Sequence, residues 1–151
     1  MSNEATLAAG TLVKYSLDLD TPAYTQIPKI LSIGALGLMA EAKESTTLSS
    51  TQKEYSHGLQ DAPDKTIKGQ FLGSDADQKA FIAACRAKTP MMIQVTYPDK
   101  PDATGTGTVA DFLFKPLGFE MDDVTAEDFM MFTVNGKQNS AVSWTDPVAG
   151  A

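Results

Sequence analysis

The sequence has 151 residues, of which 42% are hydrophobic and 21% are charged, a composition ordinary for one soluble globular domain that buries its own core. Its formal net charge of -7 argues against a surface that binds nucleic-acid phosphates, because such surfaces draw their affinity from Lys and Arg. One cysteine and one histidine exclude an internal disulfide and a Cys/His zinc site.

The N-terminal stretch MSNEATLAAG has no basic patch followed by an apolar run, so we expect no secretory signal and take the cytoplasm as the default. No apolar stretch approaches the roughly 18 residues that a membrane helix needs, and no membrane insertion is expected. Residues 1–10 lack periodicity and are predicted to form an N-terminal arm.

Most of the chain has the pattern of short β-strands. In TVADFLF, for example, alternation places Ala110, Phe112 and Phe114 on one face of a strand. In TIKGQFLG, it places Ile67, Gly69 and Phe71 on one face. The predicted strands are TLVKYSL, IPKILSIG, TIKGQFLG, MMIQVTY, TVADFLF, FMMFTVNG and SAVSWT.

One helix is predicted over residues 74–89. Ser74 or Asp75 can cap its first amides, and Pro90 ends it, since a proline disfavours helical geometry in the residue before it. Its apolar stripe at helical spacing comprises Phe81, Ala84, Cys85 and Lys88. The sequence thus predicts a single, mainly β domain over residues 1–151, an antiparallel β-sandwich or barrel with one flanking α-helix.

Candidate chemical groups are few. Ser56, His57 and Asp61 suggest a triad, but all three lie within six residues of a polar segment, so a solvated or interface histidine is the preferred interpretation. Cys85 falls on the apolar stripe of the helix, where a free cysteine is usually a core residue, although Arg86 nearby would lower its pKa if it were exposed.

Two further patterns are candidate ligand sites. The GTG at 105–107 precedes a strand and lacks a P-loop lysine, which indicates a hairpin loop. The acidic cluster lacks the ligand spacing of a calcium loop and is interpreted as a solvated connector or an acidic wall in an assembly. Its members are Glu120, Asp122, Asp123, Glu127 and Asp128. No enzyme, metal or cofactor site is predicted.

The order of several segments resembles the major tail tube protein of long-tailed, non-contractile bacteriophages. These segments are GTLVKYSLD, YTQIPKILSIGALGL, ESTTLSS, YSHGLQDA, FLGSDADQKAFIAACRAKTPMMIQVTYPD, FKPLGFEMDDVTAEDFMMFTVNGK and AVSWT. Together they cover most of the chain, and the specificity lies in their order and spacing. Ser56-His57 departs from the family pattern, where Ile-Pro is more usual.

The resemblance implies a structural protein of the virion tail. Six subunits would form a ring, rings would stack into a tube, and double-stranded DNA would pass through the lumen without specific binding. Tape measure, tail tip and tail terminator proteins would be its partners, and assembly would take place in the host cytoplasm. The implied fold is a β-sandwich whose inner sheet joins those of its neighbours.

In this light, residues 37–62 are predicted to form an extended hairpin arm or loop that docks on neighbouring subunits. The segment can pair as strands but has no core-forming run, and exposed strand edges invite another chain. A disordered linker is the alternative. The candidate interface residues are Glu41, Lys43, Glu44, Thr46, Thr47, Leu48, Tyr55 and His57. Residues 146–151 are predicted to act as a C-terminal arm.

The acidity suggests a lumen that repels phosphates, so that DNA slides without sticking. Glu41, Glu44 and Asp111 are the candidate lumen residues, with surface solubility as the equal alternative. Two other functions stay open: the tube of a contractile tail or type VI-like secretion device, and a monomeric β-sandwich binding module. The strand location of Phe71, Phe112, Phe114, Phe129 and Phe132 favours core use over a ligand site.

Overall fold

The structure is a computed structural model that describes residues 9–34, 36–37, 39–49, 51–61, 64–140 and 142–150; for 39–41 and 57–61 it describes the backbone alone. It contains one helix and ten strands in this part of the chain. The helix is α1 (Ala76–Arg86), and the strands are β1 (Leu12–Ser16), β2 (Thr25–Gln26), β3 (Ile30–Ser32), β4 (Met39–Glu44), β5 (Tyr55–Asp61), β6 (Asp64–Gln70), β7 (Met91–Thr96), β8 (Val109–Met121), β9 (Met131–Gln138) and β10 (Ser143–Thr145).

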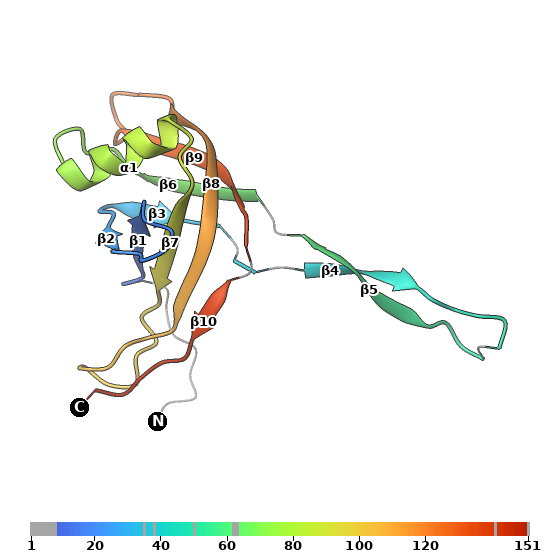
Figure 1. Ribbon diagram of the computed structural model, residues 1–151. Helices are drawn as coiled ribbons and strands as arrows, with labels where there is room; N and C mark the ends of the chain where they lie inside the picture. The colour runs from blue at the N-terminus through green and yellow to red at the C-terminus, as the bar shows by residue number, and fades with distance from the viewer. Residues whose placement is uncertain are drawn as a thin grey trace.

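Eight of these strands form one antiparallel sheet in the order β2-β1-β7-β8-β9-β6-β3, with β10 paired to β8. The sheet is strongly curved (Figure 1). Its two edge strands are joined by residues 27–29, so they are separated by at most about 14 Å of chain. No described ladder joins β2 to β3, and the sheet is therefore open. The prediction of a mainly antiparallel β fold with one helix is confirmed.

The inner face of the curved sheet holds the core. Alternation along β7 and β8 buries every second residue, as the pattern predicted for Phe112 and Phe114. Helix α1 packs Phe81 against Tyr15 of β1, with ring centroids 5.4 Å apart. The fully buried apolar side chains include Ile67, Phe81, Cys85, Met91, Ile93, Val95, Phe114, Phe132 and Val134.

Strand β8 is longer than expected and extends into the stretch predicted as an acidic connector. A register shift between Pro116 and Gly118 forms a β-bulge against β9. The bulge adds one residue, which returns Phe119 to the inner face opposite Val134 and leaves Glu120 on the outer face. The strand therefore passes a proline and a glycine without ending.

The helix begins and ends close to the predicted positions. Asp75 is the N-cap, and its Oδ1 accepts from the Gln78 amide at 2.9 Å. Gln78 is buried and donates its Nε2 to the Gln70 carbonyl at 2.8 Å, which ties the helix to the end of β6. Lys88 follows the helix with a φ of 59° just before Pro90, and it is exposed, unlike the rest of the predicted apolar stripe.

Candidate assembly surface

Strands β4 and β5 form a separate two-stranded sheet, the arm, which projects away from the body (Figure 1). Near its tip the ribbon is held by backbone pairing of Lys43 with Ser56 and of Glu44 with Tyr55. The Ser45 amide donates to the Glu54 carbonyl at 2.7 Å, and the Glu54 amide donates to Thr46 Oγ1 at 3.0 Å. The predicted hairpin thus has a defined antiparallel register.

All described side chains from 42 to 49 and from 51 to 56 are exposed. Leu48 has a relative exposure of 109% and Tyr55 one of 61%, so neither apolar group is covered by its own subunit. An isolated two-stranded hairpin is marginally stable at best in water. The arm therefore lacks the buried surface that would hold it rigid without a neighbour.

The structure places most of the predicted interface residues on this arm. Thr46 Oγ1 donates to Glu44 Oε1 at 3.2 Å, and the Thr47 and Ser49 hydroxyls lie 3.1 Å apart. The tip of the arm is therefore held by hydrogen bonds among its own polar side chains. Glu41 and His57 lie in β4 and β5, but their side chains fall outside the described part. Whether these residues contact a neighbour stays a prediction.

A second exposed surface is the outer face of the sheet, which α1 does not cover. Asp111 lies on this face in β8, where its Oδ1 accepts from Gln94 Nε2 at 3.0 Å. Burial and a hydrogen bond to Asp111 raise the pKa of Tyr24 to about 12. Asp111 is thus a half-buried, hydrogen-bonded carboxylate, and of the three lumen candidates it is the one in the sheet itself.

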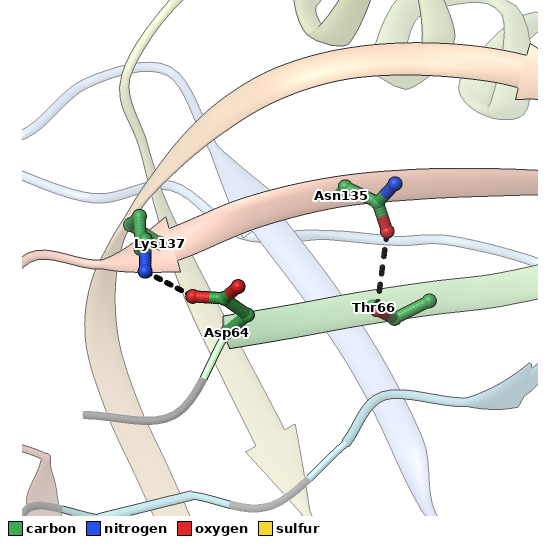
Figure 2. Close-up of polar contacts among 4 residues, drawn as sticks. All are labelled: Asp64, Thr66, Asn135 and Lys137. Atoms are coloured by element: carbon green, nitrogen blue, oxygen red, sulfur yellow. Dashed lines mark hydrogen bonds and ion pairs between the residues drawn. The ribbon is translucent and has the colours of Figure 1, made fainter.

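The outer face of β6, β9 and β8 carries a hollow of about 530 Å³, lined by polar side chains together with Leu117 and Phe119. Figure 2 shows its rim, where Lys137 pairs with Asp64 and Thr66 Oγ1 donates to Asn135 Oδ1 at 3.1 Å. Lys115 lies opposite Lys137 in the neighbouring strand. This face therefore carries charges of both signs.

The C-terminal segment lies against the loop between β7 and β8. Thr106 and Val148 form an antiparallel bridge with backbone hydrogen bonds of 2.8 and 2.9 Å. The Gly150 amide donates to Asp102 Oδ2 at 3.1 Å, and this bond lowers the pKa of Asp102. Residues 146–150 are therefore docked on their own subunit here. Of the predicted N-terminal arm, residues 1–8 lie outside the described part.

The candidate chemical groups do not converge on a site. Cys85 is fully buried, and burial raises its pKa to about 12, which identifies it as a core residue. In the extended strand β5, His57 and Asp61 are four positions apart, roughly 13 Å along the backbone, which does not suit a triad. Among the described residues, no group of three or more His, Cys, Asp or Glu is placed to hold a metal ion.

The other two ligand patterns are also explained by local structure. Gly105 and Gly107 lie in the β7–β8 loop, and the loop's Asp99 accepts from both the amide and the hydroxyl of Thr108. In the acidic cluster, Asp122 accepts from Thr133 and Asp128 accepts from Thr125, both at 2.7 Å. No described helix is long and apolar enough to cross a membrane.

Two features were missed from the sequence. Lys65 is completely buried on the inner face of β6, and no described group accepts a hydrogen bond from its Nζ. Strand alternation places Lys65 on the same face as Ile67, two residues away, so the pattern that predicts Ile67 inward also predicts Lys65 inward. Phe129 was predicted to lie in a strand, but it precedes β9 and is 75% exposed.

The phage tail tube protein family matches residues 6–146. The chain belongs to this family. It is accordingly a structural component of a virion tail and not an enzyme, which confirms the expectations drawn from the resemblance. A comparison with curated protein sequences finds no significant match.

Chains from three solved assemblies share the fold. A chain of the six-fold symmetrised baseplate of the anti-feeding prophage is 12% identical, with a TM-score of 0.71 and coverage of 97% of this chain and 98% of the other. A chain from the C6-symmetric tail of a gene transfer agent is 19% identical, with a TM-score of 0.65 and coverage of 93% of this chain and 99% of the other. The SPP1 tail tube is 12% identical, with a TM-score of 0.64 and coverage of 90% of this chain and 77% of the other.

Proposed function

We propose that this tail tube protein assembles into rings of six that stack into a tube and that the tube conducts the genome into the host. The observation that carries the proposal is the arm, a paired β-ribbon whose described side chains at 42–49 and 51–56 are all exposed, in a chain of the tail tube family. The sixfold order is supported by two structural neighbours, which come from particles with six-fold symmetry.

The arm is proposed to dock on neighbouring subunits. Its strands β4 and β5 pair only with each other among the described elements, so each keeps one edge that another chain can extend. Docking would cover Leu48 and Tyr55 and supply the burial that the ribbon lacks. The contact would involve the residues predicted from the sequence: Glu41, Lys43, Glu44, Thr46, Thr47, Leu48, Tyr55 and His57.

The outer face of the sheet is proposed to line the channel. Asp111 lies there, and Glu41 and Glu44 would join it if the arm lies along the channel wall. Lys68 and Lys115 are also exposed on this side, so the face carries cations as well as acids. Charges of both signs on this face, with a net protein charge of -7, favour passage of DNA without tight binding.

Partners follow from the tube's place in a tail. We expect contacts with tape measure, tail tip and tail terminator proteins, and assembly in the host cytoplasm. The tube of a contractile tail has the same fold, so the fold by itself does not separate the two kinds of tail.

The test combines electron microscopy with one arm substitution. Purified protein, alone and with a tail-tip preparation, should form hollow tubes or six-fold rings. Leu48→Ser should leave subunit stability unchanged, since Leu48 is fully exposed, but should raise the protein concentration needed for tubes by roughly ten-fold or more if burying the leucine stabilises the contact by about 1.5–3 kcal/mol.

Leu19→Ser is the matched control, because Leu19 is an exposed leucine of the body, outside the arm. Equal effects of the two substitutions on assembly would contradict the role of the arm. Protein that stays monomeric at every concentration, with and without the tail-tip preparation, would contradict the tube itself.

A further inference from the structure

An apolar groove of about 350 Å³ runs between α1 and the end of β8. Its walls are formed by side chains that are partly exposed or at the edge of the core, and two cations stand beside it. The groove is lined by Phe71, Gly73, Lys79, Ile82, Ala83, Arg86, Phe119 and Met121. Lys79 and Arg86 are both exposed and have no described ion-pair partner.

The loop at residues 122–130 has complementary properties. It presents Val124 and Phe129 to solvent, with relative exposures of 68% and 75%. Asp122 and Asp128 are engaged within the chain by threonine hydroxyls. The acids Asp123 and Glu127 are exposed and have no described partner, so the loop offers two apolar side chains beside two free carboxylates.

The loop does not fill the groove of its own subunit, because Phe129 would then be covered. Helix α1, which forms one wall of the groove, and the loop between β8 and β9 both lie on the side of the molecule away from the arm (Figure 1). The groove presents apolar side chains beside two cations, and the loop presents apolar side chains beside two acids. Exposed apolar patches on soluble proteins mark interaction surfaces.

We propose that the groove receives the 122–130 loop of a second copy of the chain. Phe129 or Val124 enters the apolar groove, and Asp123 and Glu127 approach Lys79 and Arg86. Each contact pairs the groove of one copy with the loop of another, and repeated head-to-tail along the copies it generates rings and open stacks. The inference rests on the proposed tube function and adds to it a contact independent of the arm.

Crosslinking tests the contact. One population of the protein carries Ala83→Cys and the other Val124→Cys, both at exposed positions. The native Cys85 is buried and its pKa is raised to about 12, so it gives little background. Mixing the two populations under oxidising conditions should give crosslinked dimers several-fold above the yield of a control mixture in which Lys100→Cys replaces Ala83→Cys.

Charge reversal provides the second measurement. Lys79→Glu/Arg86→Glu and Asp123→Lys/Glu127→Lys should each weaken self-association by roughly ten-fold or more. A mixture of the two variants should restore it, because each reversed groove then meets a reversed loop and each native groove a native loop. Restoration by mixing is not expected from variants that merely fail to fold.

The outcomes separate this inference from the proposed function. Tubes that form without the crosslink, and that tolerate either charge reversal, would overturn the groove contact and leave the tube function standing. Absence of both tubes and crosslink, with and without a tail-tip preparation, would overturn both. A crosslink at the control level in any state of assembly overturns the contact.

Discussion

Replacing the buried lysine should stabilise the subunit. Lys65 is 0% exposed, faces Gly136 across the β6–β9 ladder, and has no described acceptor for its Nζ. Burial lowers its pKa, since a charged ammonium loses its hydration in the core. Lys65→Met keeps the length of the apolar stem and removes the amine. The perturbation therefore isolates the cost of burying that amine.

The magnitude follows from the absence of a described partner. A buried polar group without a hydrogen bond costs about 1–3 kcal/mol, so the variant should gain about that much free energy of unfolding near pH 7. For a chain of this length, each kcal/mol corresponds to an increase in Tm of about 2–4 °C.

The gain should depend on pH with a defined sign. The pKa of Lys65 is lower in the folded state than in the unfolded state, so between these two values the unfolded chain binds more protons and the stability of the native protein rises with pH. The penalty is complete below the folded pKa and is lost as pH approaches the unfolded value near 10.5. The advantage of Lys65→Met should shrink over the same interval.

Urea unfolding of both proteins from pH 7 to 10.5 measures this difference. Tyr24 and Cys85, whose pKa values are raised to about 12, lower stability at alkaline pH in both proteins and cancel in the comparison. Lys68→Met is the matched control, because Lys68 is exposed on the same strand. A Lys65→Met variant that is destabilised, or whose advantage is constant with pH, would refute the reasoning.

Three other expectations follow from the core and the β7–β8 loop. Gly136→Ala should destabilise by about 1–3 kcal/mol in urea unfolding because its Cβ would overlap a buried phenylalanine ring, whereas Gly118→Ala, with open space, should change little. Cys85 should resist maleimide in native buffer and react in denaturant; rapid native labelling would contradict its burial. Hydrogen bonds from Thr108 lower the pKa of Asp99, so this carboxylate stabilises the native protein above pH 3.8 and the stabilisation is lost in stronger acid. Asp99→Asn should remove this contribution, and identical acid unfolding curves for the two proteins would count against it.

The core was predictable because its pattern is local. In β8, alternation alone identifies Phe112 and Phe114 as inward, and the helical spacing of Phe81 and Cys85 gives their common face. Each of these residues lies in an element long enough for its period to repeat.

Long-range pairing explains where prediction failed. Strand β8 continues past Pro116 because β9 provides a partner on the far side of a bulge, and no local signal reports that partner. Phe129 shows the opposite error: an aromatic residue next to a strand pattern was assigned to the core, but the β9 ladder starts two residues later. Both outcomes depend on which strand pairs with which, and not on the residue's own neighbours in sequence.

The arm was predictable as a feature but its contacts were not. The polar, β-branched stretch with Thr46 and Thr47 predicts strands without a core. The structure shows such a ribbon, although these two threonines lie in the connection between its strands and not in the strands themselves. What covers the ribbon depends on other subunits, and a single chain contains no record of their positions. The same limit applies to the groove beside α1, whose walls come from segments distant in sequence.

Stability and assembly are separable in this subunit. No described side chain at 42–49 or 51–56 is buried, so substitutions there remove no contact that holds the body together. The body has its own core, formed between the inner face of the sheet and α1. Arm substitutions should therefore alter tube formation at constant Tm, while core substitutions should lower Tm first. Such a chain can stay folded as a monomer while its arm is not yet rigid. The arm becomes ordered when it docks on a neighbour, because the surface buried in the contact offsets the conformational entropy that the arm loses.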